Sequence, residues 1–144
     1  MSMKFLLLPL LLALPLTLQS CGDDDDVTTA PAAVTAAFSA KYPSVAVSGW
    51  EVKGNTYKAE FTSAKGAEAE AWFAADGTWL RTETDYFDAL PEPVNTYIDT
   101  TYPGYYVDDK DWVETPTKAY FDLELEAAGR PDVHLNITAD GQPV

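Results

Sequence analysis

Hydrophobic residues along the chain follow two spacings that alternate. Between residues 31 and 41 they stand at Val34, Ala37 and Phe38, which is the i, i+3, i+4 spacing of one helix face. This predicts an amphipathic helix over about 31–41. The helix should end at Tyr42-Pro43, because the residue before a proline is pushed out of the helical conformation.

After this helix, apolar positions alternate with polar ones, which is the period of a β-strand. The alternation predicts strands at about 45–53, 56–62, 67–74 and 78–87. Asp76-Gly77, between the last two strands, is typical of a two-residue type I′ hairpin, because both central positions of that turn need positive φ. A two-residue loop would pair Ala74 with Trp79, Phe73 with Leu80 and Trp72 with Arg81.

The same order of patterns occurs again about sixty residues later. Val94, Tyr97 and Ile98 form a second helical stripe ending at Tyr102-Pro103, and Trp50 recurs as Trp112. Alternation then predicts strands at about 105–114, 119–127 and 132–138. The inward residues of the last two strands are predicted to be Phe121, Leu123, Leu125, Val133, Leu135 and Ile137.

These patterns predict a tandem duplication, with repeat 1 over residues 31–88 and repeat 2 over residues 89–144. Each repeat is expected to hold one helix and a three- to four-stranded antiparallel sheet, with the last strand of repeat 2 vestigial or missing. The fold class is α+β, and the two units should share one curved sheet with both helices on one face.

Helices on one face leave the other face of an antiparallel sheet open to water. By the pairing above, that open face carries Trp72, Trp79, Arg81, Lys58 and Glu60. Large aromatic side chains there indicate a candidate patch for a protein or peptide partner. The alternative is that Trp72 only stacks under Arg81 as a cross-strand cation–π pair, or that a curled sheet buries the tryptophans.

The first residues indicate an exported protein. Residues 1–20 resemble a signal peptide, with Lys4 ahead of a leucine-rich stretch, and Leu18-Gln19-Ser20-Cys21 resembles a bacterial lipobox. This resemblance implies cleavage before Cys21 and its lipidation, which would anchor the protein in the outer membrane. The alternative is an ordinary secretory cleavage in which Cys21 plays no part.

An acidic run follows the cysteine. Residues 21–30 are expected to form a solvated tether, because Asp23 to Asp26 repel one another. The run resembles the acidic tract of surface-exported lipoproteins of the Bacteroidetes, although the sequence leaves the periplasmic and surface sides both open. A calcium site here is disfavoured, because no turn glycine or distal glutamate completes a loop.

Charge and residue inventory exclude several functions. The formal net charge of −14 and the scattered basic residues argue against nucleic acid as a partner. With Cys21 lipidated, the domain keeps no thiol for a disulfide, a nucleophile or a metal. His134 is the only histidine, and no catalytic, phosphate-binding or metal-ligand motif surrounds it. Asp108, Asp109 and Asp111 are interpreted as a solvated strand edge rather than a cation site. We therefore expect no enzyme, no cofactor and no metal.

The order of short motifs resembles a known family. These are Trp50-Glu51-Val52, the strand from Tyr57 to Phe61, the stretch from Phe73 to Trp79, and Leu90-Pro91 opening a second copy. Together they resemble the beta-lactamase-inhibitor-like, PepSY-like family over about residues 31–144. The resemblance implies a concave antiparallel sheet with helices behind it, and it assigns no binding residue to this chain.

The sequence thus favours a non-enzymatic, lipid-anchored envelope protein. It would bind a protein or peptide, as an inhibitor does, through the open sheet face. The alternative is an accessory envelope lipoprotein whose sheet face has no specific ligand.

Overall fold

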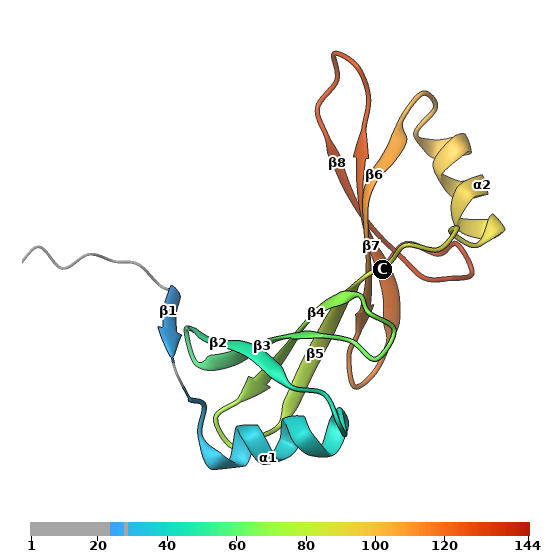
Figure 1. Cartoon of the computed structure of the whole chain (residues 1–144). Coiled ribbons are helices and arrows are strands. Elements are labelled where there is room, and N and C mark those ends of the chain that lie inside the picture. Colours follow the sequence, from blue (N-terminus) through green and yellow to red (C-terminus); the bar gives the residue numbers. More distant parts are fainter. Residues whose placement is uncertain (1–23, 28) are drawn as a thin grey trace, which may run out of the picture.

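The computed structural model describes residues 24–27 and 29–144, and it forms two helices and one antiparallel sheet (Figure 1). The elements in chain order are β1 (Asp24–Val27), α1 (Ala32–Lys41), β2 (Val47–Lys53), β3 (Thr56–Thr62), β4 (Glu68–Ala74), β5 (Trp79–Asp85), α2 (Glu92–Thr101), β6 (Tyr106–Glu114), β7 (Ala119–Glu126) and β8 (Val133–Ile137). Each strand pairs with its neighbours in sequence, so the eight strands form a meander in the order β1 to β8. The α+β class and the open antiparallel sheet are confirmed.

Each helix covers its own part of the sheet, and we call α1 with β2–β5 the first half and α2 with β6–β8 the second half. Val34 and Phe38 of α1 are buried against β3 and β4, whose inward residues are alanines and phenylalanines. In the second half, Val94 and Ile98 of α2 pack on leucines of β7 and β8. Figure 1 shows the halves meeting where β5 lies beside β6.

Both helices begin and end in the same way. Pro31 and Pro91 occupy the N-cap positions, and neither helix has a side-chain cap. At the other end, the N–H of Tyr42 donates to the carbonyl oxygen of Phe38, and Tyr102 does the same to Ile98, both at 2.8 Å. The prediction that each helix stops at its Tyr-Pro pair is therefore confirmed.

The β4–β5 hairpin differs from its prediction. Only Gly77 has positive φ in the loop, so the turn is not type I′. Trp72 pairs with Arg81 as predicted, but Phe73 pairs with Trp79, which leaves Leu80 as an extra residue in a bulge. One extra residue in a strand moves the side chains on its far side to the opposite face of the sheet. Trp79 therefore lies on the helix side, and Leu80 is exposed.

Two further expectations, one about the predicted tether and one about Asp111, are corrected. Asp24–Val27 is not a free linker, since its backbone pairs with β2 as strand β1, from Asp24 opposite Lys53 to Val27 opposite Trp50. Asp111 is not at an edge, because β6 pairs with both β5 and β7. The signal peptide and the predicted lipidation of Cys21 lie outside the described residues.

Past β8, the described residues add a turn and one bridge to the sheet but no further strand. After β8 the chain turns at Gly141 and forms a single bridge between Ile137 and Pro143. The N–H of Val144 also donates to the carbonyl oxygen of Asn136 at 2.9 Å.

Candidate functional site on the helix-free sheet face

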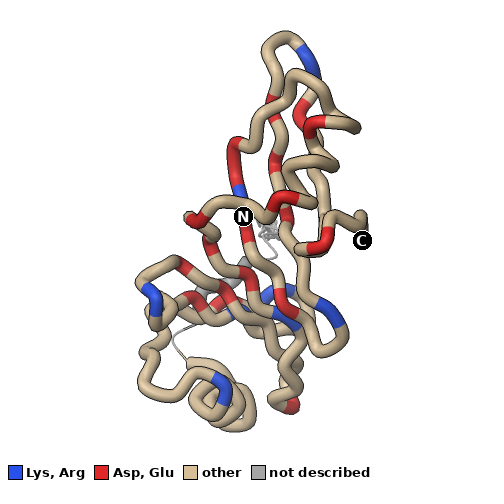
Figure 2. Tube along the Cα trace, turned by 90° about the vertical axis from the view of Figure 1, so that its right-hand side faces the viewer, with Lys and Arg blue, Asp and Glu red and all other residues tan. Residues whose placement is uncertain are grey.

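The sheet face opposite the helices, here called the free face, is lined mostly by carboxylates. Strand alternation directs to it the acidic residues Glu51, Glu60, Glu68, Glu70, Glu83, Asp85, Asp109, Asp111, Asp122, Glu124 and Glu126. Figure 2 shows Asp and Glu recurring along the strands of both halves, with few Lys and Arg among them. The chain's strong negative charge is therefore concentrated on one surface.

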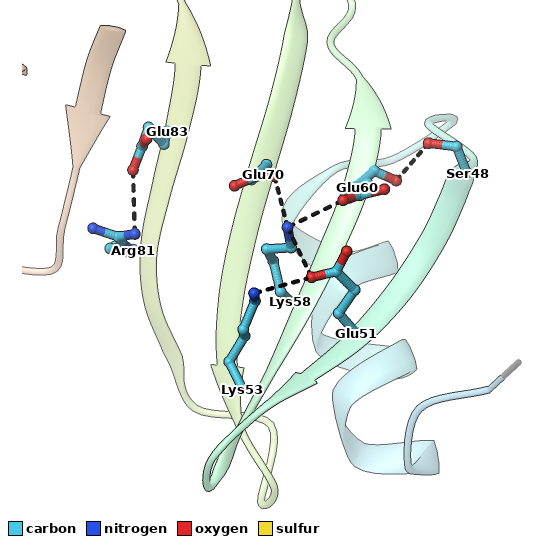
Figure 3. A network of polar contacts seen from close by, with 8 residues as sticks. All are labelled: Ser48, Glu51, Lys53, Lys58, Glu60, Glu70, Arg81 and Glu83. Carbon is cyan, nitrogen blue, oxygen red and sulfur yellow. Dashed lines mark hydrogen bonds and ion pairs between the residues drawn. The ribbon is translucent and has the colours of Figure 1, made fainter. Parts of the chain in front are cut away.

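Lys58 lies among three of these carboxylates in the first half. Its Nζ is 2.8 Å from Glu70, 3.0 Å from Glu51 and 3.1 Å from Glu60 (Figure 3). The residue is only 7 % exposed. Burial by itself lowers the pKa of Lys58, but hydrogen bonds to the three carboxylates outweigh it and raise that pKa. The ammonium is therefore firmly charged and offsets part of the negative charge of these three carboxylates.

Trp72 and Arg81 lie side by side next to Lys58. The guanidinium carbon of Arg81 is 3.8 Å from the centroid of the Trp72 ring, and its Nη2 is 3.2 Å from Glu83. Strand register brings the pair together, since Trp72 and Arg81 are directly opposite on β4 and β5. The cross-strand cation–π pair named as an alternative in the sequence is thus present, on the predicted face.

Trp79 does not belong to this site. It packs against the first hydrophobic core, and its Nε1 donates to Thr82 Oγ1 at 2.9 Å. The ammonium of Lys41 lies 3.5 Å from the centroid of the Trp79 ring. The Thr82 hydroxyl is also hydrogen-bonded to the Tyr42 hydroxyl. Of the five predicted binding residues, Trp72, Arg81, Lys58 and Glu60 lie on the free face, and Trp79 lies behind the sheet.

A hollow of about 300 Å³ opens on the free face where the two halves meet. Its charged lining residues are Glu60, Glu68, Glu70, Glu83, Asp85 and Asp111. Asp85 and Asp111 are directly opposite across β5 and β6, and Asp122 continues the row on β7. Like charges in direct cross-strand register repel one another, so this row is electrostatically unfavourable.

Three carboxyl groups of the hollow, those of Glu83, Asp85 and Asp111, hold their protons more tightly than usual. Burial first, and then the charges of Asp109, Glu83, Asp85 and Asp122, raise the pKa of Asp111 to about 7. Burial also raises the pKa of Glu83, and burial with Glu68, Asp109 and Glu70 raises that of Asp85. In contrast, hydrogen bonding to Lys58 lowers the pKa of Glu51.

The sequence did not point to the hollow. The sequence groups Asp111 only with its neighbours Asp108 and Asp109, because alternation within one strand says nothing about the strand beside it. The pairing of Asp85 with Asp111 depends on β5 meeting β6, two strands separated by a helix. His134, the only histidine, is exposed, with its Nε2 4.0 Å from Glu124.

Comparison with known families identifies the chain. The family described as "putative beta-lactamase-inhibitor-like, PepSY-like" matches residues 55–142, and the protein belongs to this family. No curated protein matches the sequence.

Solved structures with the same fold come from Bacteroides species. A BLIP-like protein from Bacteroides fragilis is 29 % identical, with a TM-score of 0.71 over 82 % of this chain and 85 % of that one. A DUF2874 family protein from Bacteroides uniformis is 26 % identical, with a TM-score of 0.71 over 81 % and 87 %. A protein from Bacteroides eggerthii, described as periplasmic, shares the fold at 22 % identity and a TM-score of 0.70, over 81 % and 86 %.

In the part of the chain that the structure describes, neither helix has the length and apolar character needed to cross a membrane.

Proposed function

We propose that this protein is a non-enzymatic binding protein that holds a protein or peptide on the free face of its sheet. The observation that carries the proposal is the free face itself. It is broad and charged, and both helices pack on the opposite side. On it the Arg81 guanidinium stacks on the Trp72 ring, and a hollow lies beside this cation–π pair. Aromatic and arginine side chains carry much of the binding energy at protein interfaces.

The proposal includes export and anchoring. The leucine-rich leader over residues 1–20 and the lipobox-like residues before Cys21 support a lipid anchor in the outer membrane. The free face would then be presented outside the cytoplasm, on either side of that membrane. Labelling with radioactive palmitate tests this part: wild type should carry label, and a Cys21→Ala variant should not.

We also infer that the two halves arose by duplication of one helix-and-strands unit. Three shared details support this. Both helices begin after a proline and end at a Tyr-Pro pair. Both have a buried pair spaced i, i+4, and both are followed by a strand with a bulge, at Val47/Gly49 in β2 and at Val107/Asp109 in β6.

An affinity experiment with the full chain tests the binding role. Tagged wild type, extracted from the source organism's envelope, serves as bait beside the double variant Trp72→Ala/Arg81→Ala. A third bait, Phe87→Ala, is the control. Phe87 is 76 % exposed in the link between β5 and α2, so this substitution removes an aromatic side chain that lies outside the free face.

A protein retained by wild type and Phe87→Ala but lost by the double variant supports the proposal, once the purified pair repeats the result. If all three baits retain the same proteins, the free face is not the binding surface. The accessory role, with no specific ligand on that face, then becomes the better explanation.

A further inference from the structure

We propose that the hollow between the two halves receives a lysine or arginine side chain of a basic protein partner. This inference rests on the proposed function and adds the chemistry of the partner. Asp85 and Asp111 would be the principal contacts, with Glu83 and Glu68 beside them. The partner's surface would be positively charged, opposite in sign to the free face.

The first half already shows how this face holds a cation. Lys58 extends from β3 and places its ammonium within 3.1 Å of three carboxylates contributed by β2, β3 and β4. This arrangement is a built example of a lysine bound by the free face. Its stability comes from charge-assisted hydrogen bonds that repay the burial of the ammonium.

Part of the carboxylate lining of the hollow is left without an internal cation. Among residues 29–144, the ion pairs of Lys and Arg go to Glu51, Glu60, Glu70 and Glu83, and none goes to Asp85 or Asp111. The charges that raise the pKa of Asp111 are those of other carboxylates, Asp109, Glu83, Asp85 and Asp122. A positive group entering the hollow would therefore gain attraction from several carboxylates and relieve the repulsion between them.

The shape of the surroundings favours a side chain on a protein surface over a free ion. The hollow is open to solvent and continues into the broad free face, where Trp72 and Arg81 can contact the rest of a partner. Complementary charge across such a surface accelerates association and excludes partners of like charge. Basic partners are thus selected, and acidic ones are repelled.

The test measures binding of a defined probe to the full chain by calorimetry. The probe is a glycine peptide carrying three lysines, and the control peptide has norleucine in place of each lysine. We compare wild type with Asp85→Asn/Asp111→Asn. The matched control is Asp88→Asn/Asp99→Asn, which removes the same charge from two exposed residues away from the hollow.

We expect wild type to bind the lysine probe, more weakly as salt is added, and the Asp85→Asn/Asp111→Asn variant to bind roughly tenfold more weakly. The same variant should melt at a higher temperature than wild type, because its cross-strand repulsion is gone. Weaker binding by a more stable protein cannot be attributed to unfolding. The Asp88→Asn/Asp99→Asn variant should bind nearly as wild type does.

Several results would overturn the inference. These are equal loss in both double variants, equal binding of the norleucine peptide, and calcium binding that depends on Asp85 and Asp111 while the lysine probe does not bind. Failure of wild type to bind the probe would also overturn it. That failure leaves the proposed function standing, since the affinity experiment with Trp72→Ala/Arg81→Ala decides it separately.

Discussion

In the first half of the sheet one lysine is surrounded by three carboxylates, whereas the second half has a row of carboxylates with no lysine among them. Lys58 is ion-paired with Glu51, Glu60 and Glu70, all within 3.1 Å. Across the junction, Asp111 meets Asp85 on one side and its row continues to Asp122 on the other. Three carboxylates of the first half thus share an internal cation, whereas the row through Asp111 and Asp122 has no ion pair with a Lys or Arg among residues 29–144.

Behind the sheet the two halves are much more alike. In each, a glycine in a turn lies against the first turn of the helix: a Cβ on Gly77 would be 2.6 Å from the carbonyl oxygen of Ala33, and one on Gly141 would be 2.7 Å from that of Pro93. The similarity behind the sheet and the difference in front of it separate two roles. The helix side builds the fold, and the free face is where the two halves differ.

The largest effect expected from a single substitution tests the contact between turn glycine and helix that both halves share. Gly77→Ala and Gly141→Ala should each lower the free energy of unfolding by about 3 kcal/mol, because positive φ costs about 1–2 kcal/mol and the clash adds about 1–3 kcal/mol. Gly129→Ala is the control, since its φ is also positive but its Cβ would meet nothing within 4 Å.

Chemical denaturation measures all three variants. Gly129→Ala should lose only about 1 kcal/mol, the cost of the backbone conformation alone. If Gly77→Ala and Gly141→Ala differ clearly from one another, the two turns do not play equivalent parts, and the likeness behind the sheet is superficial.

A second pair of substitutions separates the two faces within the first half. Trp79→Ala should cost about 2 kcal/mol, because the ring is partly buried against the core and its Nε1 donates to Thr82. Trp72→Ala should cost only about 0.5–1 kcal/mol, the value of an exposed cation–π pair. Thermal melts would settle the order, and an equal loss from both would mean that Trp72 is a core residue as well.

The same two tryptophans show how far the sequence could predict the structure. Helix ends, strand spans and inward residues followed from local spacing, as Tyr42-Pro43 and Leu123 illustrate. The prediction for Trp79 is wrong because a bulge at Leu80 adds one residue, and no pattern within either strand reveals a bulge. Trp72, one step further from the turn, kept its predicted partner.

The candidate site was predictable only in part for a related reason. Trp72, Arg81, Lys58 and Glu60 belong to neighbouring strands joined by short turns, so their shared face follows from register. Asp85 and Asp111 come together through a pairing that spans α2, and the sequence between them does not fix it. The burial that makes Asp111 unusual depends on that pairing.

Removing the balancing lysine should make the first half resemble the second. Lys58→Met leaves three carboxylates without their ammonium and should cost about 2 kcal/mol, less than a fully buried pair because Glu60 and Glu70 are partly solvated. Denaturation at neutral pH measures this loss, and Lys65→Met on an exposed turn is the control.

The pH dependence of that loss identifies its cause. The lowered pKa of Glu51 contributes stability above its ordinary value of 4.5 that is lost as pH falls through the folded pKa. The raised pKa of Lys58 contributes stability that is complete below its ordinary value of 10.5. The difference between wild type and Lys58→Met should therefore be full between about pH 5 and 10 and shrink in acid. A loss that is constant down to pH 3 would point to packing instead of charge.

Asp111→Asn should act in the opposite direction. Because the folded protein raises the pKa of Asp111 from 3.8 to about 7, it binds a proton more tightly than the unfolded chain does. Wild-type stability should therefore fall as pH rises from about 4 to about 7 and then level off. Removing the charge should stabilise the fold at pH 8 by about 1 kcal/mol, after allowance for solvent screening, and change little at pH 4.

Thermal melts of Asp111→Asn across this range, with Asp99→Asn on the exposed side of α2 as control, give the comparison its sharpest form. If Asp111→Asn fails to stabilise at pH 8, the second half is balanced by a group outside this row. If it stabilises while Lys58→Met destabilises, removing one charge from each half has opposite effects. A carboxylate whose removal stabilises the fold does not serve folding. Binding of a positively charged partner to the free face, as proposed above, accounts for its presence.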